Sequence, residues 1–243
     1  MIDMDCESRD SRTLRLLGSG GMERLASATV MVAGVGGVGG YCLEMLARSG
    51  VGNLVIIDSD AVAPSNINRQ LIAMTDTVGQ PKTELWRQRI LSINPEARVT
   101  AIESFITTDN AGELLTAYRP DFLADAIDTV APKCRLIECA VAMRIPLISS
   151  MGAGGRLDPS RVRYATLAET REDGLARAVR ERLKRKIDIG RLRVVFSDEA
   201  PRRNAIVELD LPNKRSSYGT LATIPAIFGI YMANHIIRKI TGC

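Results

Sequence analysis

Aromatic residues are scarce in this chain: phenylalanine, tryptophan and tyrosine together make up 4% of its 243 residues. An aromatic platform that stacks the bases of single-stranded nucleic acid is therefore not expected. The cysteines number five, an odd count, and no two of them have CxxC spacing. Neither a disulfide scaffold nor a four-cysteine zinc site is therefore expected.

The chain also lacks an apolar run at its start. Residues 1–12 are charged and polar, so we expect a flexible leader there rather than a signal peptide, and a cytoplasmic protein. Residues 219–237 carry no charged side chain and are long enough to suggest a membrane span. Because they include Pro225, Asn234 and His235, they predict a buried helix instead, with a subunit contact as one candidate position. We interpret His235, the lone histidine, as a packed helix residue rather than an acid–base catalyst.

The composition is that of an ordinary globular protein, with 46% hydrophobic and 25% charged residues. The length is sufficient for one large domain or two small ones. No repeat, low-complexity tract or linker divides the chain, so we expect residues 1–243 to form a single domain.

Short apolar runs alternate with helical segments along the first part of the chain. A helical segment at 13–28, interrupted by glycines, comes first. The expected strands are 29–33, 54–57, 98–103, 122–127 and 146–150, and the expected helices between them are 41–49, 83–92, 109–116 and 132–143. This alternation predicts an α/β fold, a Rossmann-like nucleotide-binding domain with a mostly parallel sheet. Later runs at 161–166, 192–197 and 205–209 predict mixed or antiparallel strands that extend this sheet.

A glycine-rich turn connects the first expected strand to the following helix. Gly34, Gly36, Gly37 and Gly39 fit a GxGxxG pattern there. Glycines let the backbone turn tightly and approach a phosphate, whose charge the helix N-terminus favours. Asp58 ends the next strand, about 20 residues on, where a carboxylate can accept hydrogen bonds from ribose hydroxyls. Together these residues predict an adenine-nucleotide site without identifying the nucleotide.

The residues after that strand favour ATP over a nicotinamide dinucleotide. A dinucleotide holds its pyrophosphate on backbone N–H groups and needs no added cations. ATP carries about four negative charges, and breaking its α–β bond builds more on the leaving pyrophosphate. Arg69 and Lys82 suit this demand, and Asn66 can donate to a phosphate oxygen.

Two acidic residues belong to the expected strand 122–127 and its end. Asp128 follows the strand directly, where ligands gather at the carboxyl edge of an open sheet. Its carboxylate could hold a Mg²⁺ ion that bridges phosphates, or it could cap the next helix. We interpret Asp125 as structural.

Three motifs carry a resemblance to a known family: GxGGxG at 34–39, DxDxVxxSNxxRQ at 58–70 and VGQPK at 78–82. They resemble the ubiquitin-activating-enzyme-like adenylyltransferases, over about residues 13–150. The resemblance implies a nucleotide-binding α/β domain, usually a homodimer. It also implies the reaction of a carboxylate with ATP to give an acyl adenylate and pyrophosphate.

The second half is similar to one branch of this family, the tRNA threonylcarbamoyladenosine dehydratases. The similar segments are 150–159, 167–170, 175–184, 195–199, 218–220 and 228–229. This branch implies that ATP activates the carboxylate of a threonylcarbamoyl group on the anticodon stem-loop of tRNA. The activated carboxyl then closes into a ring, with net loss of water.

The resemblance also implies roles for single residues. Asp58 would bind the ribose, and Asp128 would hold Mg²⁺. The phosphates would be addressed by Asn66, Arg69 and Lys82. Arg15 resembles an N-terminal arginine that reaches the phosphates in the partner subunit's site.

The cysteines differ from those of the wider family. The zinc cysteines of many sulfur-carrier enzymes are missing, and none lies between Cys139 and Cys243, where a thioester-forming nucleophile would be expected. We interpret Cys42, Cys134 and Cys139 as small core residues. We therefore expect adenylation without covalent thiol transfer, which favours the tRNA branch.

Three alternatives stay open. An adenylyltransferase for a ubiquitin-like sulfur carrier would share all the ATP residues. An NAD-dependent oxidoreductase would use the glycine turn and Asp58 but leave Arg69 and Lys82 idle. A nucleotide-binding adaptor without turnover would dock a cysteine desulfurase or sulfur-acceptor partner.

A basic stretch lies between Arg177 and Arg193, where eight basic residues stand against two acidic ones. A solvated helix face would explain it, but an RNA-binding surface is the more specific hypothesis. The candidate nucleic-acid residues are Arg177, Arg180, Arg182, Lys184, Arg185 and Lys186.

Overall fold

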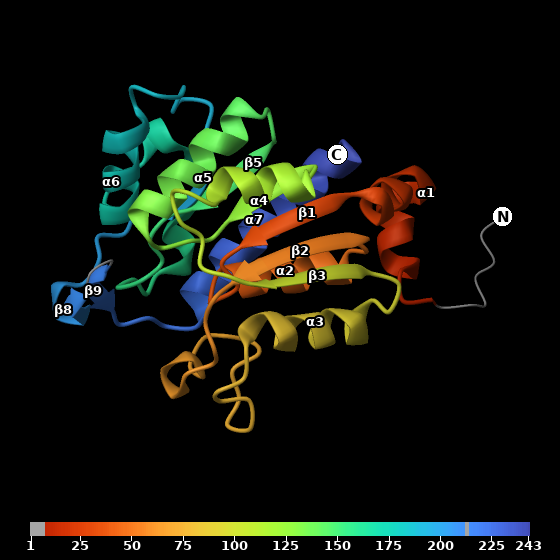
Figure 1. The fold of residues 1–243 in the computed structure, drawn as a ribbon, viewed down its shortest axis with the longest axis horizontal. Coiled ribbons are helices and arrows are strands. Elements are labelled where there is room, and N and C mark those ends of the chain that lie inside the picture. The colour runs from red at the N-terminus through yellow and green to blue at the C-terminus, as the bar shows by residue number, and fades with distance from the viewer. Residues whose placement is uncertain (1–7, 212–213) are drawn as a thin grey trace.

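The computed structural model describes residues 8–211 and 214–243 of the chain. Its strands are Thr29–Ala33 (β1), Asn53–Asp58 (β2), Arg98–Glu103 (β3), Phe122–Asp125 (β4), Leu147–Ser150 (β5), Val162–Thr166 (β6), Arg193–Ser197 (β7), Ile206–Leu211 (β8) and Lys214–Tyr218 (β9). Its helices are Ser11–Ser27 (α1), Gly39–Arg48 (α2), Lys82–Ile93 (α3), Ala111–Tyr118 (α4), Val130–Ala142 (α5), Gly174–Leu183 (α6) and Thr223–Thr241 (α7). Figure 1 shows their arrangement.

The main sheet has seven strands in the order β3-β2-β1-β4-β5-β7-β6. Neighbouring strands are parallel throughout, except that β6 runs antiparallel to β7. The predicted α/β fold with a mostly parallel sheet is therefore confirmed. Strand β1 pairs with β2 on one side and β4 on the other, so the chain changes direction across the sheet there. In open α/β sheets, ligands bind at such a switch point, beyond the carboxyl ends of the strands.

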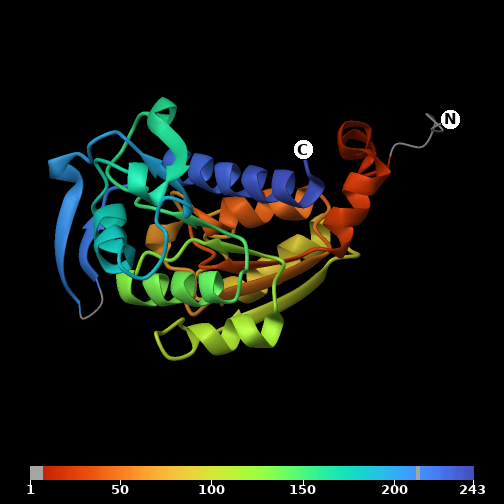
Figure 2. The same ribbon diagram turned by 90° about the horizontal axis from the view of Figure 1, so that it is seen from above.

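Helices cover both faces of the sheet, as the two views in Figures 1 and 2 show. One face packs against α2, α3 and α7, and its core includes Trp86, Phe228 and Met232. The other face packs against α4, α5 and α6. The central strands β1, β2 and β4 are buried on both sides because both faces are covered, and they therefore appear in the sequence as continuous rather than alternating apolar runs.

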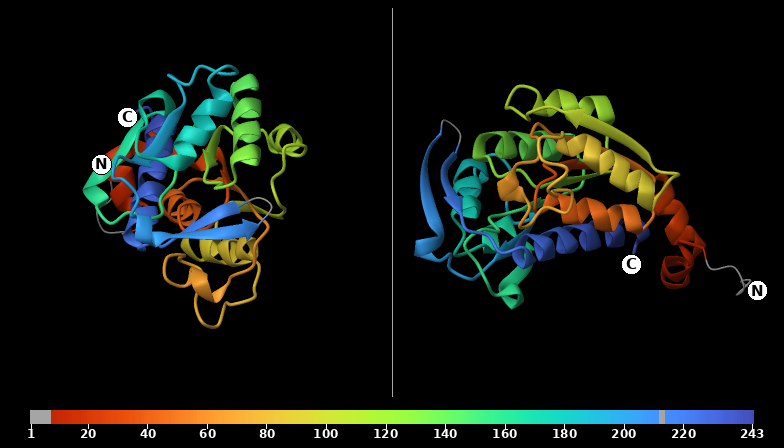
Figure 3. Two further views of the ribbon diagram at one scale, coloured as in Figure 1. Left: turned by 90° about the vertical axis from the view of Figure 1, so that its left-hand side faces the viewer. Right: turned by 90° about the horizontal axis from the view of Figure 1, so that it is seen from below.

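The expected strand 205–209 is present as β8, but not where it was predicted. It pairs antiparallel with β9 in a separate two-stranded sheet, which stands at one end of the molecule (Figure 3). Its partner follows directly in sequence, and an antiparallel pair needs only a short connection. Of the three later runs, only two, β6 and β7, therefore join the main sheet.

Two further boundaries differ from the prediction. Helix α1 begins at Ser11, so the expected leader 1–12 is shorter, and residues 1–7 lie outside the described ranges. Of the glycines expected to interrupt this helix, only Gly18 has non-helical angles, with φ of 69° and ψ of 170°. A positive φ costs glycine little, so a kink forms there rather than a helix end.

The uncharged stretch 219–237 contributes most of α7, as predicted. One side of this helix is buried, including Phe228, Met232 and Ile236, while Ile230 and Tyr231 are exposed on the other. Over residues 8–211 and 214–243, no helix has both the length and the apolar character that crossing a membrane requires.

His235 is packed between two aromatic rings on the buried side of α7. Its ring meets Phe122 edge to face at 5.6 Å between centroids, and its Nδ1 shares a hydrogen bond of 2.7 Å with the Tyr164 hydroxyl. Burial, assisted by Lys239 and Arg193, lowers the pKa of His235 to about 4. The imidazole is therefore neutral at pH 7, in agreement with the predicted packing role.

The α2–α7 contact depends on a glycine that has no room for a side chain. A Cβ atom at Gly229 would lie 2.3 Å from the Val38 carbonyl oxygen and 2.7 Å from the Cys42 nitrogen. Both are backbone atoms, so only a shift of a whole helix would relieve the clash. Because α2 begins at the glycine turn, this contact also positions that turn.

We expect Gly229→Ala to lower the free energy of unfolding by about 3 kcal/mol, through overpacking against backbone. Gly174→Ala is the matched control, because a Cβ there meets nothing within 4 Å. It should change stability by less than about 1 kcal/mol. Urea denaturation followed by circular dichroism compares the two, and equal midpoints would refute the packing argument.

Candidate functional site

The glycine turn between β1 and α2 is closed by backbone contacts that exclude side chains. A Cβ atom at Gly39 would lie 1.8 Å from the carbonyl oxygen of Gly34, and Gly34 itself has a φ of 82°. A Cβ at Gly34 would lie 3.0 Å from the Ala126 oxygen. The turn is therefore pressed against the loop after β4, and the first helical N–H groups of α2 stay at the carboxyl edge of the sheet.

Asp58 is bound to the glycine turn by its own carboxylate. One oxygen accepts a hydrogen bond from the Val35 N–H at 2.8 Å, and the other accepts from the Asp60 N–H at 2.9 Å. Burial raises the pKa of Asp58, while Lys82 and these two N–H groups oppose the rise. The predicted ribose residue thus lies beside the turn, and each oxygen retains acceptor capacity for a hydroxyl.

Lys82 lies at the same edge, at the start of α3. Its side chain is only 4% exposed, and its Nζ pairs with the Asp60 carboxylate at 2.7 Å. Asp60 itself is 65% exposed. The structure therefore places Lys82 as a buried cation with one partner already in place, next to Asp58, rather than as a surface residue. Asp60 belongs to the motif at 58–70, but the sequence alone predicted no role for it.

The segment 65–70 lies over the glycine turn. A Cβ at Gly37 would contact the Arg69 side chain at 3.4 Å, and one at Gly36 would lie 3.5 Å from the Gln70 amide nitrogen. The Arg69 guanidinium donates to the Ser65 carbonyl and to the Asn68 side chain.

Two amides of this segment are buried. The Asn66 side chain accepts a hydrogen bond from the Ala63 N–H at 3.1 Å, which shapes the short helical turn Pro64–Asn66. Gln70 is also buried, and its Oε1 has no hydrogen-bond partner. An orphaned buried acceptor beside a glycine turn is a position where a ligand donor would be favoured. Gln70 was missed as a site residue, although it ends the quoted motif.

Asp128 is not at the end of a strand. Strand β4 stops at Asp125, because its partner β1 turns away after Ala33, the residue paired with Asp125. The Asp125 carboxylate also accepts from the Ile127 N–H at 3.2 Å and bends the chain. Asp128 is exposed on the loop that follows, next to the loop residue that the glycine turn contacts.

Asp125 is structural, as interpreted, and its partner is a buried lysine. The Lys133 ammonium pairs with Asp125 at 2.8 Å, and both side chains are 0% exposed. Lys133 also donates to the Ile127 carbonyl, and Ser149 donates to the Asp125 carboxylate. This pair fixes the loop that carries Asp128. In the sequence Lys133 is one of three charged residues of this helix, and periodicity does not connect it to any particular acid.

A second buried pair shapes the loop after β5. The Arg156 guanidinium donates to the carbonyls of Gly152, Glu172 and Glu199 and pairs with Asp173 at 3.3 Å. Asp173 in turn accepts from the Ala176 N–H and caps α6. Burial raises the pKa of Asp173, and Arg156 opposes the rise. The carboxyl edge of the sheet is therefore bordered by two loops that are held by internal charges.

Arg15 is not brought together with the other site residues. It is exposed on α1, which precedes β1 and lies at the end of the molecule opposite the β8–β9 sheet (Figure 1). Leu16 beside it is 83% exposed. Within one subunit, Arg15 lies at the amino edge of the sheet, away from the glycine turn.

The three cysteines that were interpreted as core residues fit that interpretation, whereas Cys243 is exposed. Cys42, Cys134 and Cys139 are buried. Burial raises the pKa of Cys134 to about 11 and that of Cys42 higher still, so neither is a thiolate at neutral pH. In the ranges 8–211 and 214–243, no three acidic, histidine or cysteine side chains gather into a metal cluster.

The basic stretch divides between exposed and inward-facing residues. Arg177, Arg182, Lys184, Arg185 and Lys186 are exposed on α6 and the turn after it. Lys184 pairs with Glu181, and Lys186 pairs with Glu138. Arg180 differs from the prediction, because its guanidinium turns inward and donates to the Thr170 carbonyl and hydroxyl. We therefore omit it from the candidate surface.

Comparisons with known proteins agree with this geometry. The ThiF family model matches residues 8–243. The tRNA threonylcarbamoyladenosine dehydratase of Bacillus subtilis is 37% identical over 238 residues, covering 95% of this chain and 93% of that protein. The crystal structure of the Escherichia coli tRNA N6-threonylcarbamoyladenosine dehydratase TcdA in complex with ATP superimposes with a TM-score of 0.87. It is 36% identical and covers 96% of this chain and 94% of its own.

A sulfur-carrier enzyme matches over a shorter length. The Escherichia coli sulfur carrier protein ThiS adenylyltransferase is 33% identical over 139 residues, which is 56% of this chain and 55% of that protein. The similarity to the dehydratases extends through both halves of the sequence and the fold. The chain therefore belongs to the ThiF family, in the branch of the tRNA threonylcarbamoyladenosine dehydratases.

Proposed function

We propose that this protein is an ATP-dependent dehydratase that adenylates the carboxylate of threonylcarbamoyladenosine in tRNA and closes it into a ring. The observation that carries the choice of substrate is the share of the chain over which each kind of relative is similar. Similarity to the dehydratase extends over 95% of the chain, whereas similarity to the sulfur-carrier adenylyltransferase covers 56%. The nucleotide chemistry rests on the glycine turn, Asp58, Arg69 and Lys82, which lie together at the carboxyl edge of the sheet.

The first step needs no general base. The substrate carboxylate is ionised at neutral pH and attacks the α-phosphorus of ATP, giving an acyl adenylate and pyrophosphate. The task of the protein is to position the two reactants and to stabilise the charge that develops on the phosphates. The backbone N–H groups at the start of α2, together with Arg69, Lys82 and Asn66, supply donors for this purpose. Asp58 would hold the ribose.

The second step is intramolecular. A nucleophilic atom of the threonylcarbamoyl group attacks the activated carboxyl carbon and expels AMP, so the ring forms with net loss of one water. Attack within one molecule has a high effective concentration, and it outpaces hydrolysis where water is excluded. The raised pKa values of Cys42 and Cys134 are consistent with a route that forms no thioester.

The residues fit a magnesium ion that is held mainly by the phosphates. Mg²⁺ is commonly bound by one or two carboxylates together with substrate phosphates and water. Asp128, an exposed carboxylate on the loop beside the glycine turn, suits that arrangement. When bound, the ion would neutralise negative charge on the phosphates.

A homodimer would give Arg15 a role. Because α1 lies at the amino edge of its own subunit, Arg15 would act in the nucleotide site of a partner subunit. Leu16 on α1, and Ile230 and Tyr231 on α7, are exposed apolar side chains that a second subunit would cover. This protein would be cytoplasmic, and its tRNA substrate would approach the exposed cations of α6.

The function is tested by incubating the purified protein with ATP, Mg²⁺ and tRNA that carries threonylcarbamoyladenosine. Digested nucleosides are then analysed by mass spectrometry. A nucleoside lighter by one water, formed together with AMP, is expected. Formation of AMP only after addition of a ubiquitin-like sulfur carrier would contradict the proposal and support the sulfur-carrier alternative.

In the same assay, Arg69→Ala should reduce turnover about 100-fold or more, because a charge that stabilises the transition state is lost. Asp128→Ala should have a similar effect if it holds the ion. Arg98→Ala, at the exposed start of β3, is the control and should keep normal turnover. Near-normal rates in either site variant would remove that residue from the proposed machinery.

The RNA surface makes a separate prediction. Charge reversal in the double variant Arg182→Glu, Arg185→Glu should weaken tRNA binding at least tenfold and reduce its salt dependence, since cations that neutralise phosphates are lost. ATP binding should be unaffected. The double variant Arg87→Glu, Arg98→Glu, on α3 and β3, is the matched control. Filter-binding titrations measure both, and equal affinities would refute the surface.

A further inference from the structure

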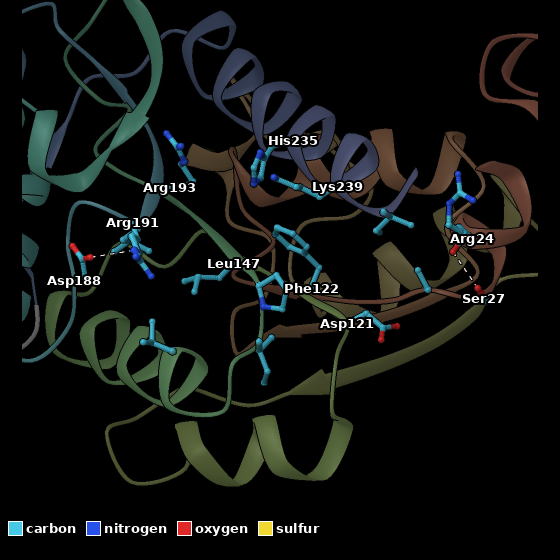
Figure 4. Close-up of a pocket in the computed structure, with 16 residues that line it drawn as sticks. Arg24, Ser27, Asp121, Phe122, Leu147, Asp188, Arg191, Arg193, His235 and Lys239 are labelled. Carbon is cyan, nitrogen blue, oxygen red and sulfur yellow. Dashed lines mark hydrogen bonds and ion pairs between the residues drawn. The ribbon is translucent and has the colours of Figure 1, made fainter. Parts of the chain in front are cut away.

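A second concave site lies at the opposite edge of the sheet, where the strands begin. It has a volume of about 930 Å³ and lies between the C-terminal end of α7 and the end of α5 (Figure 4). We call it the amino-edge groove and define it by Arg24, Phe122, Leu147, Arg193 and Lys239. None of these residues belongs to the nucleotide site, which lies beyond the other ends of the same strands.

The shape of the groove follows from the strand order. Its lining includes Ala28 before β1, Phe122 of β4, Leu147 of β5 and Arg193 of β7, and these strands are neighbours in that order. Neighbouring strands are about 4.8 Å apart, so three spacings give a groove about 14 Å long. An extended peptide rises about 3.3 Å per residue, so four or five residues would span it.

The floor of the groove is apolar. Phe122 and Leu147 lie at its centre, and Val141 from α5 lines it while remaining 40% exposed. Pro146 and Ile145 complete this side. The Phe122 ring is only 3% exposed and so presents little face for stacking a base, and the aliphatic side chains around it offer no partner for phosphates. The floor therefore favours an occupant with apolar side chains at its middle.

The rim of the groove is cationic. Arg24 stands at the β1 end, Arg191 and Arg193 stand at the β7 end, and Lys239 projects from α7 between them (Figure 4). The two acidic residues of the lining are already engaged. Asp188 pairs with Arg191 at 3.3 Å, and Asp121 accepts a hydrogen bond from the Thr29 N–H. Four cations stand against these two carboxylates, so the net charge of the lining is positive, and a cation lies at each end of the groove.

The cationic rim is partly preorganised. The Arg193 guanidinium lies 5.6 Å from the centre of the Tyr164 ring, and Arg24 donates to the Thr241 carbonyl. The lowered pKa of His235 is due in part to Lys239, Arg193 and Arg238, after burial, and so reports a positive field at this wall.

We infer that the amino-edge groove binds an extended segment of a partner protein that has acidic side chains at both ends and apolar side chains between them. The cations at the two ends of the groove would pair with the acidic side chains of the segment, and the apolar floor would contact the side chains in its middle. Occupancy would leave the nucleotide site open, because the two sites lie at opposite edges of the sheet. The inference does not depend on the proposed reaction.

The test uses a fluorescein-labelled peptide of sequence Asp-Glu-Leu-Val-Leu-Glu-Asp and fluorescence anisotropy with the full-length chain. Saturable binding is expected. Arg191→Glu and Val141→Glu should each weaken it about tenfold, the first by charge repulsion and the second by placing a carboxylate on the apolar floor. Both side chains are exposed at 40% or more, so folding should be preserved. Arg185→Glu, an equal charge change outside the groove, should leave peptide affinity unchanged.

Two peptide controls separate the groove from general attraction to a basic protein. Replacing the apolar centre by serines should reduce binding about tenfold, and so should replacing the acidic ends by lysines. Equal loss in Arg191→Glu and Arg185→Glu would show binding by net charge alone and would overturn the inference, as would an absence of binding to the unmodified protein.

Other occupants give distinct results, each of which contradicts the inference. If Arg191→Glu weakens tRNA binding while the peptide does not bind, the groove belongs to an RNA surface. If Val141→Glu changes the mass measured by analytical ultracentrifugation, a second copy of the chain covers it. In the assay for the proposed reaction, Val141→Glu should turn over at the normal rate, so a failure of one proposal is distinguishable from a failure of the other.

Discussion

The structure depends on the tightness of the glycine turn between β1 and α2. The Asp58 carboxylate holds the Val35 N–H at 2.8 Å, and the space between Gly34 and Gly39 excludes any Cβ. These contacts fix where α2 begins and therefore where its unpaired N–H groups point. They also require α7 to approach α2 through Gly229, since the same turn is covered by that helix. The fold and the proposed nucleotide site thus share one constraint.

Buried charges shape the loops around this turn. The Asp125–Lys133 pair is fully buried and holds the loop after β4, while Arg156 and Asp173 hold the loop after β5. Removing one member of such a pair leaves a buried charge without a partner, which typically costs about 3–5 kcal/mol. The loops at the carboxyl edge are therefore rigid for reasons that lie below the surface. Rigid loops suit a reaction in which the protein contributes mainly position and charge.

The sequence predicted the sheet well because its strands are short, apolar and regularly separated by helices. Strand β3 and strand β1 were predicted with their observed bounds, and the glycine turn fell where the pattern placed it. The predicted end of β4, at residue 127, was wrong. Strand β4 ends at Asp125 because its partner β1 turns away there and because the Asp125 side chain bends the chain, and the pattern of apolar residues shows neither effect. The placement of β8 was wrong because its pairing with β9 is local and the run 214–218 carries no strong apolar signal.

The candidate site was predictable where residues are close in sequence and not where they meet only in space. Asp58, Asn66, Arg69 and Lys82 stand within one segment, and the structure gathers them. The partners Asp60, Gln70 and Lys133 had no separate signal, because a buried polar group is recognised only by what it contacts. The inward turn of Arg180 likewise depends on Thr170, ten residues away. The amino-edge groove combines residues from α1, α5, α7 and three strands, which no spacing pattern could reveal.

The two edges of the sheet therefore differ in character. The carboxyl edge is built from glycines, buried acids and cations, and the amino edge combines an apolar floor with a cationic rim. The central claim is that the cations after β2 serve a triphosphate. Isothermal titration calorimetry of the protein with ATP and Mg²⁺, and separately with NAD⁺, tests it most directly. Saturable heat with ATP and none with NAD⁺ is predicted, whereas no heat with ATP, or binding of NAD⁺ in its place, would contradict the account.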